Sequence, residues 1–425
     1  SAASDVYKRQ ILMDRFIAPI HKLAADSVMW MYRHIYIPYR AYIIRRKSII
    51  KVGFEITSLG VWKTETLFRM MQEHPRFNPL AIVARNKLEN VADERNSIEE
   101  YCKKKGYDYV VIGKDLEHAS KSLGFDIFFY QRPYVSRTDL SKNLKPLFCY
   151  VTYGFRGTLG RWAYDRPLLK NAWQIYYENE SNNRVYTELL GTDIDNGYTT
   201  GIPIMDELMT TKEQLKDLWK GSSDKKRIIY APHHSINPND VFHSSTFLET
   251  GEMMLRIAEK YSDKVQWLFK PHPVLKNKLH EIWGKEKTDE YYKRWSEAEW
   301  SQFENGKYLE FFKYSDAMIH DCGSFTIEYL YTCNPVMYLL HDKESLAKDW
   351  NEMQTKALDV HIHGCSENDI EEFIENVVSD NDVNNRQRTI FYNKYLIPPF
   401  GKSACQNIID CILNPKASKR MRVLK

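Results

Sequence analysis

The stretch that decides the fold runs from Asp316 to Glu328 and reads DAMIHDCGSFTIE. Its apolar residues are typical of a buried strand, and a polar turn containing a glycine follows at once. A helical pattern then begins near Ser324, with Glu328 one turn further on. The first backbone N–H groups of a helix are unsatisfied and its dipole is positive there, so the turn predicts a phosphate-binding pocket. The carboxylate of Glu328 is suited to holding a ribose diol.

Two further turns in the same half of the chain also follow apolar strand patterns. They are Tyr230–Ser235, which reads YAPHHS, and Lys270–Pro273, which reads KPHP. Ligands of parallel α/β sheets bind at the carboxyl ends of the strands, so the three turns together predict a site for a nucleoside diphosphate donor. Each turn also has an ordinary structural explanation, because Ser324 with Glu328 resembles a helix cap and a turn histidine often caps a neighbour.

Cationic and imidazole side chains in these turns are the candidates for chemistry. Prolines fix the backbone around Lys270 and His272, so both side chains can be aimed at a leaving diphosphate with little entropic cost. Consecutive side chains diverge, so we expect one of His233 and His234 to face the site and the other to be structural. The expected catalytic residues are His272, Lys270 and His234. The expected donor-binding residues are Pro232, His233, Ser235, Asp321, Cys322, Gly323, Ser324, Phe325 and Glu328.

Neither a metal nor a cofactor is expected. Asp193 and Asp195 form an Asp-x-Asp that resembles a metal site, but they lie in a Gly- and Asn-rich loop and are interpreted as a solvated turn. The seven cysteines have no metal-type or paired spacing, which argues against zinc and against a disulfide framework.

Strand patterns alternate with helical ones along the chain, which favours α/β architecture with parallel sheets. At 425 residues we expect two doubly wound, Rossmann-type domains facing a central cleft. The expected organisation is a basic aromatic segment at 1–47, a first domain at 48–204, a second domain with the three turns at 205–415, and a basic tail at 416–425. Tyr308–Lys313 is expected to be one of the short strands of the second domain.

The charge distribution bears on partners and location. A net charge of +4 argues against a nucleic-acid binder. Basic and aromatic residues gather near the N-terminus, which suits an anionic membrane surface, although a solvated basic helix explains them equally well. No apolar run is long enough to span a bilayer, and no secretory signal is evident, so we expect a cytoplasmic protein at the inner face of the membrane. Residues 1–10 resemble a translated sequencing adapter and are set aside as an artefact.

Taken together, these motifs resemble the CDP-glycerol glycerophosphotransferase family, which includes bacterial teichoic-acid and capsule polymerases and primases. The resemblance extends from about Phe148 to Cys411. The residues that carry it are Tyr230-Ala-Pro, Lys270-Pro-His-Pro, Ser315-Asp316, Asp321-Cys-Gly-Ser, Glu328-Tyr-Leu, Asn334-Pro335, Gly401-Lys-Ser-Ala and the Gly201-x-Pro-x-x-Asp206 turn.

The resemblance implies a GT-B fold and transfer of an alcohol phosphate, glycerol phosphate first, from a CDP-alcohol to a hydroxyl of a polymer or a lipid-linked acceptor, with release of CMP. The CDP-alcohol is then a substrate and not a cofactor. One position departs from the family, because Tyr153-Gly154 stands where polymerases carry His-Gly, and a tyrosine is a poor general base at neutral pH. Either another residue, His234 or Glu65, deprotonates the acceptor, or the acceptor chemistry differs. The expected acceptor-side residues are Tyr153, Gly154 and Glu65.

Three other functions fit the same pattern. A GT-B glycosyltransferase that uses a nucleotide sugar for capsule or surface polysaccharide would need the same phosphate cradle. A sugar-nucleotide epimerase would share the fold but has no need of a basic aromatic N-terminal segment. A binding protein that has lost catalysis would explain the missing His-Gly.

Overall fold

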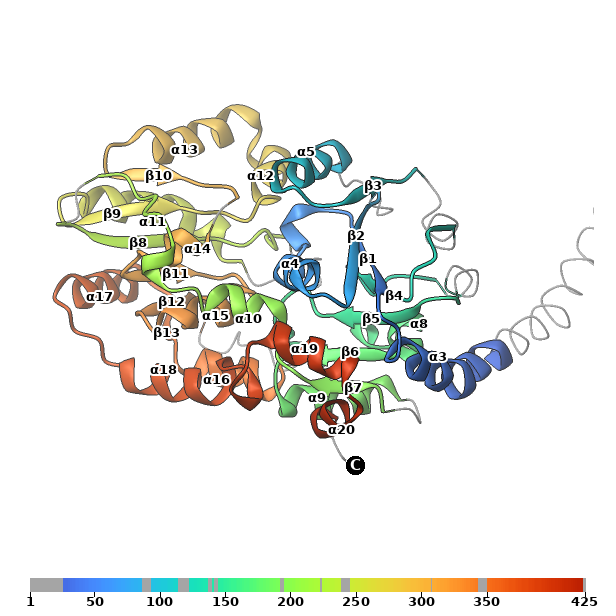
Figure 1. The fold of residues 1–425 in the computed structure, drawn as a ribbon. Coiled ribbons are helices and arrows are strands. Elements are labelled where there is room, and N and C mark those ends of the chain that lie inside the picture. The colour runs from blue at the N-terminus through green and yellow to red at the C-terminus, as the bar shows by residue number, and fades with distance from the viewer. Residues whose placement is uncertain are drawn as a thin grey trace, which may run out of the picture. The chain divides into compact units, whose positions relative to one another are not determined.

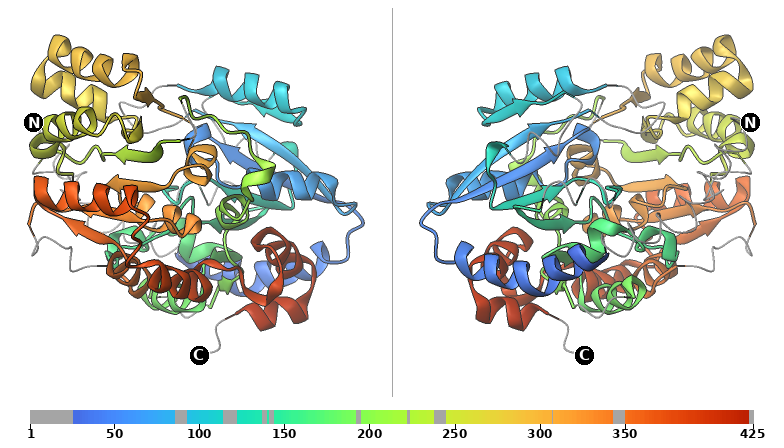
Figure 2. Two further views of the ribbon diagram at one scale, coloured as in Figure 1. Left: turned by 90° about the vertical axis from the view of Figure 1, so that its left-hand side faces the viewer. Right: turned by 90° about the vertical axis from the view of Figure 1, so that its right-hand side faces the viewer.

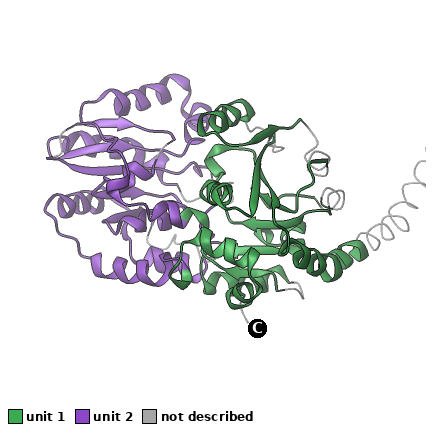
Figure 3. Cartoon of the chain, viewed as in Figure 1, with its two compact units in different colours: residues 1–153, 160–204, 399–425 green, residues 154–159, 205–398 purple. Residues whose placement is uncertain are grey.

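Two parallel sheets organise the chain, and each is the centre of one compact unit (Figure 3). Unit 1 comprises 1–153, 160–204 and 399–425, and unit 2 comprises 154–159 and 205–398. The computed structural model describes residues 26–85, 93–113, 122–136, 140, 144–191, 195–221, 224–237, 245–306, 308–342 and 350–422.

The sheet of unit 1 has seven strands in the order β3-β2-β1-β4-β5-β6-β7. All neighbouring pairs are parallel, and the chain changes direction across the sheet between β1 and β4, as in a doubly wound fold. Buried apolar runs explain why these segments form strands. The strands are β1 (Ile50–Ile56), β2 (Phe77–Val83), β3 (Tyr109–Val111), β4 (Ile127–Tyr130), β5 (Leu147–Val151), β6 (Gln174–Tyr177) and β7 (Gly197–Thr199).

Helices cover both faces of this sheet. Residues 26–44, which include η2 (Tyr32–Tyr36) and α3 (Ile37–Ile44), pack with α8 (Pro167–Asn171) and α9 (Glu180–Leu190) on one face. On the other face, α4 (Glu65–Glu73) contacts α19, a helix from the far end of the chain. Further helices in the described part of this unit are α5 (Arg95–Lys105), α19 (Ala404–Leu413) and α20 (Pro415–Met421), and α10 (Pro203–Leu208) spans the passage into unit 2.

Unit 2 contains a six-stranded parallel sheet in the order β10-β9-β8-β11-β12-β13, which can be followed from top to bottom in Figure 1. The chain changes direction across the sheet between β8 and β11. The strands are β8 (Lys226–Ala231), β9 (Val265–Phe269), β10 (Ser301–Phe303), β11 (Ala317–His320), β12 (Val336–Leu339) and β13 (Ile362–Gly364).

One face of the second sheet carries the main core of unit 2. Side chains of β8, β9, β11 and β12 pack there against α11 (Phe247–Lys260), α12 (Leu275–Trp283), α13 (Lys285–Glu297) and α17 (Glu367–Val378). Figure 2 shows the same helices and strands in two further views. The other helices of this unit are α14 (Leu309–Lys313), α15 (Phe325–Glu328), α16 (Glu352–Asp359) and α18 (Asn385–Phe391).

The expected α/β class with two parallel-sheet domains is confirmed. The strand expected at Tyr308–Lys313 is wrong, because this segment forms α14 and buries Leu309, Phe311 and Phe312 on one side of a short helix. The second domain was expected to continue to residue 415, whereas Pro399–Lys425 belongs to unit 1. Among the described residues, no helix combines the length and the apolar character needed to cross a bilayer.

Gly53 in β1 allows the two central strands of unit 1 to pack closely. A methyl group at this position would lie 2.6 Å from Cδ2 of Phe128, whose side chain is fully buried in β4. We expect Gly53→Ala to lower the free energy of unfolding by about 1–3 kcal/mol, because the core cannot accept the extra atom without moving a ring. Urea unfolding measures this loss. Gly60→Ala is the control, since its nearest neighbour would be Ser58 Oγ at 3.8 Å, and equal losses in the two variants would contradict the packing argument.

Candidate functional site in unit 2

The three turns singled out in the sequence lie side by side at one edge of the second sheet. β8 pairs in parallel with β9 on one side and with β11 on the other, so the segments that follow these strands are neighbours. Backbone hydrogen bonds continue past the strand ends, from Lys270 N to Tyr230 O (2.8 Å) and from His272 N to Pro232 O (2.9 Å). The edge is also the point where strand order reverses, which is where open α/β sheets bind ligands.

Asp321 joins the β11 turn to the β8 turn and to the start of α11. Its Oδ1 accepts the backbone N–H of His233 at 2.5 Å, and its Oδ2 accepts the backbone N–H of Thr246 at 2.8 Å and the hydroxyl of Ser245 at 3.0 Å. The side chain is 1% exposed, and burial raises the pKa of this carboxyl to about 6, although the donors around it act in the opposite direction. The donor-binding role expected for Asp321 stays a prediction, but its contacts show that it holds the turns together.

Three half-buried histidines gather at this edge. The ring centroids of His233 and His234 lie 4.3 Å apart, and those of His234 and His272 lie 4.1 Å apart. The structure therefore differs from the expected divergence of the adjacent pair, because both rings lie against His272. The backbone anchor of His233 on Asp321 and the contact of its Nδ1 with Ser235 Oγ (2.8 Å) hold the first ring in this position.

Electrostatics keep the central imidazole of this group uncharged. Burial, followed by His234, His233 and Lys270 in that order, lowers the pKa of His272 to about 2. Lys270 is 5% exposed, and its Nζ lies 3.5 Å from the carbonyl oxygen of Gly306. A buried cation beside neutral imidazoles is an environment that favours an anionic ligand.

In the turn after β11, the side chain of Ser324 does not form the helix cap that was the ordinary structural explanation of this motif. Ser324 has helical backbone angles and makes no capping hydrogen bond with its side chain. The backbone N–H groups of Ser324 and Phe325 instead act on the buried thiol of Cys322, whose pKa rises to about 12 because burial outweighs them. The helix α15 that follows Gly323 has four residues and continues as the 3-10 turn η6 (Tyr329–Thr332).

Glu328 lies buried beyond this turn and is 5% exposed. Its carboxylate pairs with the hydroxyl of Tyr308, and burial together with this carboxylate raises the pKa of that phenol well above its ordinary value. Phe325 packs edge-on against Phe312, with 5.0 Å between ring centroids, so it contributes to the core of unit 2. The ribose-binding role of Glu328 stays a prediction.

The expected acceptor-side residues lie elsewhere in the chain. The carboxylate of Glu65 accepts hydrogen bonds from the hydroxyls of Tyr107 (2.7 Å) and Tyr101 (2.9 Å), which tie α4 to α5 and the segment after it. Tyr153 is 41% exposed at the end of a unit 1 segment, and Gly154 begins the short segment assigned to unit 2. Asp195 belongs to unit 1, and its partner Asp193 lies outside the described residues.

Sequence inspection missed a second set of polar residues that supports the turns. Ser245 and Thr246 donate hydrogen bonds to Asp321. A Ser-Thr pair directly before an apolar helical pattern is a recognised sign of a helix start, and it could have drawn attention to these residues. His320 and His361 form a buried pair with their Nε2 atoms 3.3 Å apart. These two residues are 41 positions apart in the chain, so no local sequence pattern predicts the contact.

The part of the chain that contains these three turns matches the model of a known protein family. Residues 168–414 match the model described as CDP-Glycerol:Poly(glycerophosphate) glycerophosphotransferase. The chain belongs to this glycerophosphotransferase family. The match includes all three turns of the site in unit 2, whereas Glu65, Tyr153 and Gly154 lie outside it.

Solved structures agree with the fold of this glycerophosphotransferase family member. A histidine variant of the wall teichoic acid polymerase TagF is similar, with a TM-score of 0.61 and 12% identity, over 94% of this chain and 98% of that one. The same variant soaked with CDPG has a TM-score of 0.60 and 13% identity, over 94% of this chain and 99% of that one. A putative UDP-N-acetylglucosamine 2-epimerase from Listeria monocytogenes has a TM-score of 0.55 and 13% identity, over 86% of this chain and 96% of that one.

The likenesses to solved structures support the GT-B class and no more, since transferases and epimerases share it at these identities. A search of the curated proteins gave no match. The family assignment therefore comes from the family model alone.

We expect Asp321→Asn to loosen the turns, because an amide replaces one of two acceptor oxygens with a donor. The free energy of unfolding should fall by about 1–3 kcal/mol, the cost of unsatisfied buried partners. Amide hydrogen exchange should accelerate at His233 and Thr246. Asp316→Asn is the control, since Asp316 Oδ2 accepts the N–H of Arg227 at 2.7 Å at the other end of β11, and its effect should stay near Arg227.

The same carboxylate gives an expected pH dependence. With its pKa at about 6, protonation at about pH 5 should reproduce the loss of amide protection in the wild-type protein. Because this pKa lies above the unfolded value of about 3.9, proton uptake between the two values itself favours the folded state. The loss at lower pH is therefore local and not global, and protection of His233 that stays unchanged at about pH 5 would contradict this role of Asp321.

Proposed function

We propose that this protein transfers glycerol phosphate from CDP-glycerol to a hydroxyl of a cell-surface polymer or a lipid-linked acceptor and releases CMP. The observation that carries the proposal is the family match over residues 168–414, which includes every residue of the three turns. A CDPG soak of the similar polymerase TagF agrees with a cytidine diphosphate donor. The environment of Lys270 and His272 supports binding of the donor diphosphate.

The reaction is a displacement at phosphorus. The acceptor hydroxyl oxygen forms a bond to the phosphorus that bears glycerol, and the bond from that phosphorus to the bridging oxygen of CMP breaks. CMP departs with the electron pair, and the hydroxyl proton passes to a base. Negative charge grows on the bridging oxygen, so fixed donors and a cation near the diphosphate lower the barrier.

The residues of unit 2 suit the donor half of this reaction. Lys270 and His272 face growing negative charge on the leaving phosphate, and Glu328 binds the ribose diol. The turn residues Cys322, Gly323 and Ser324 border the diphosphate. No metal or other cofactor is proposed, and that absence stays a prediction.

Two residues are candidates for the base that takes the acceptor proton, Glu65 and His234. Glu65 already accepts two tyrosine hydroxyls, so its carboxylate is committed to packing within unit 1. His234 lies beside His272 in the donor region, which makes it the better candidate of the two. The acceptor-side roles of Tyr153 and Gly154 stay predictions.

The donor is tested by measuring CMP release from CDP-glycerol, CDP-ribitol, and UDP- and CDP-sugars, with and without EDTA. We expect turnover of a CDP-alcohol that persists in EDTA and falls by about 100-fold or more in His272→Ala, because a preorganised donor to the phosphate is lost. His280→Ala is the control, since His280 lies on α12 and its side chain pairs with Asp289 on α13. Turnover of nucleotide sugars alone would favour the glycosyltransferase alternative instead.

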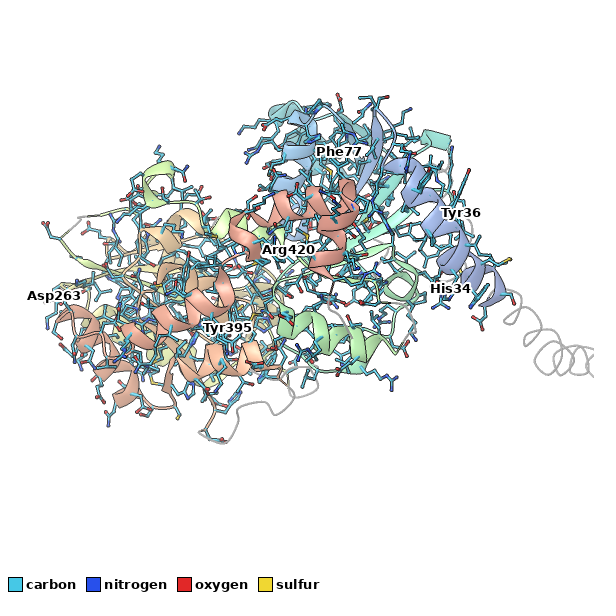
Figure 4. All side chains as sticks on the ribbon, turned by 60° about the horizontal axis from the view of Figure 1, so that its bottom comes forward. His34, Tyr36, Phe77, Asp263, Tyr395 and Arg420 are labelled. Carbon is cyan, nitrogen blue, oxygen red and sulfur yellow. The ribbon has the colours of Figure 1, made fainter. Side chains whose placement is uncertain are left out.

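We further propose that the protein associates peripherally with the inner face of the cell membrane through residues 26–44. Met31, Ile35, Tyr39 and Tyr42 are about half exposed or more and recur at helical spacing. Met29 and Tyr32 on the same segment are buried in unit 1. Figure 4 shows the side chains of this segment, with His34 and Tyr36 labelled.

Charge directly after this segment suits anionic lipid. The guanidinium carbon of Arg46 lies 3.4 Å from the ring centroid of Tyr42, which places a cation beside an exposed aromatic ring. Aromatic side chains with adjacent basic groups are the usual composition of an interfacial helix.

Vesicle sedimentation tests this surface. The wild-type protein should bind phosphatidylglycerol-containing vesicles, and the double variant Ile35→Ser, Tyr39→Ser should bind at least about tenfold more weakly, since two apolar anchors are removed. Ile390→Ser is the control, because Ile390 is 58% exposed on α18 of unit 2. Equal binding of both variants, or no binding to anionic vesicles, would refute the proposal.

A further inference from the structure

A repeated backbone contact determines where the ring protons of the site histidines lie. The backbone N–H of Val274 donates to Nδ1 of His272 at 3.2 Å, and the backbone N–H of Ser235 donates to Nδ1 of His233 at 3.3 Å. The hydroxyl of Ser235 lies 2.8 Å from the same Nδ1 of His233 and can act as a second donor to it. In both cases the donor is the residue two positions further along the chain. A ring nitrogen that accepts a hydrogen bond carries no proton, so the neutral ring has its proton on Nε2.

The same contact recurs at His320, where the assignment can be checked against a chain of partners. The N–H of Cys322 donates to Nδ1 of His320 at 3.1 Å, which leaves the proton on Nε2. This Nε2 lies 3.3 Å from Nε2 of His361, whose Nδ1 lies 2.7 Å from the carbonyl oxygen of Ala357. A carbonyl can only accept, so His361 is protonated on Nδ1 and accepts from His320 at Nε2. The two assignments are mutually consistent.

We infer that His233 and His272 are neutral hydrogen-bond donors whose Nε2–H groups bind an anionic phosphate oxygen, and that neither ring is a base or a metal ligand in the resting protein. The identification of that oxygen with the donor diphosphate rests on the proposed function. The tautomers themselves follow from the hydrogen bonds and are independent of which ligand is bound.

A metal site is the competing use of these side chains. Within the described part of the chain, His233, His234 and His272 form a group whose ring nitrogens lie within 4.8 Å of one another, close enough to share an ion. Ligation through Nε2 requires the proton to move to Nδ1, where it would point at the N–H of Ser235 or Val274. Ligation through Nδ1 requires the lone pair that those N–H groups already use. Binding a metal would therefore cost both turns their hydrogen bonds.

The charges around the rings point the same way. Lys270 is buried next to His272 and lowers its pKa, which shows that the pocket opposes a further positive charge. The carboxylate of Asp321 is directed at the backbone of His233 and the start of α11, and the hydrogen bonds found for it reach no imidazole ring. Neutral donors near one buried cation can bind a diphosphate without first taking up protons.

Nuclear magnetic resonance of the full chain with 15N-labelled histidine tests the tautomers directly. We expect His272 to show the neutral Nε2–H form across about pH 5.5 to 8, and the neutral form of His233 to be the Nε2–H tautomer. Inorganic pyrophosphate should shift the Nε2 proton downfield and leave Nδ1 acceptor-like. The resonances are assigned by their loss in His233→Asn and His272→Asn. A proton on Nδ1, an imidazolium at neutral pH without ligand, or metal-bound Nε2 with stoichiometric zinc would each overturn the inference.

Two substitutions at His272 distinguish the role of its Nε2–H as a donor to phosphate from the role of its Nδ1 as an acceptor within the turn. The substitution His272→Gln places an amide N–H near the position of Nε2. The substitution His272→Asn places an acceptor oxygen near the position of Nδ1, so it keeps the hydrogen bond from Val274 N–H and loses the donor to phosphate. We expect His272→Asn to weaken pyrophosphate binding by about 10- to 100-fold, as for a lost hydrogen bond to a charged group, and His272→Gln to weaken it less. The opposite order would overturn the inference.

His74→Asn is the matched control, since the N–H of Arg76 donates to Nδ1 of His74 at 3.2 Å in unit 1. Its pyrophosphate binding should match that of the wild type. The outcome is separable from the proposed function. Neutral Nε2–H tautomers without turnover of CDP-glycerol would contradict the proposed function and support the inference. Turnover of CDP-glycerol with Nδ1–H tautomers would support the proposed function and contradict the inference.

Discussion

The buried carboxylate of Asp321 is the interaction on which the site in unit 2 depends. Parallel pairing brings the ends of β8, β9 and β11 to one edge, and backbone hydrogen bonds beyond the strand ends link the β8 turn to the β9 turn. The β11 turn is connected to the β8 turn through a side chain. Asp321 supplies this connection, because its two oxygens accept from His233 and Thr246, which come from separate segments of the chain. A buried carboxylate is costly unless donors surround it, and here the donors are the backbone groups that must be held in place.

The second constraint is the neutral, fixed form that we infer for the imidazoles of His233 and His272. An imidazolium would bind a diphosphate more strongly, but it would have to be created against burial and against Lys270. A neutral N–H with a fixed direction gives up that charge and gains preorganisation, since no proton has to arrive before the ligand does. In the proposed reaction, Lys270 would supply the positive charge and the histidines would contribute direction.

Much of the arrangement could be predicted from the sequence, because strand ends in a parallel sheet meet at one edge. The strand at Ala317–His320 and the convergence of three turns followed from apolar runs that end in polar, proline-bracketed residues. The partners of Asp321 could not be predicted, since 75 residues separate it from Thr246 and the contact exists only after folding. The helix at Leu309–Lys313 was missed because a short apolar run has no decisive periodicity.

The fold is compatible with more than one chemistry, and the residues of the site favour one of them. Epimerases and teichoic acid polymerases resemble the chain to a similar degree, so the sheet order serves both kinds of chemistry. An epimerase must move a proton at carbon, whereas a phosphotransferase has to stabilise charge on phosphate oxygens. Histidines whose Nδ1 is occupied by a backbone N–H, and whose pKa is depressed as at His272, are poor proton carriers and adequate phosphate ligands. The same hydrogen bonds that fix the turns therefore favour phosphoryl transfer over proton transfer at this edge of the sheet.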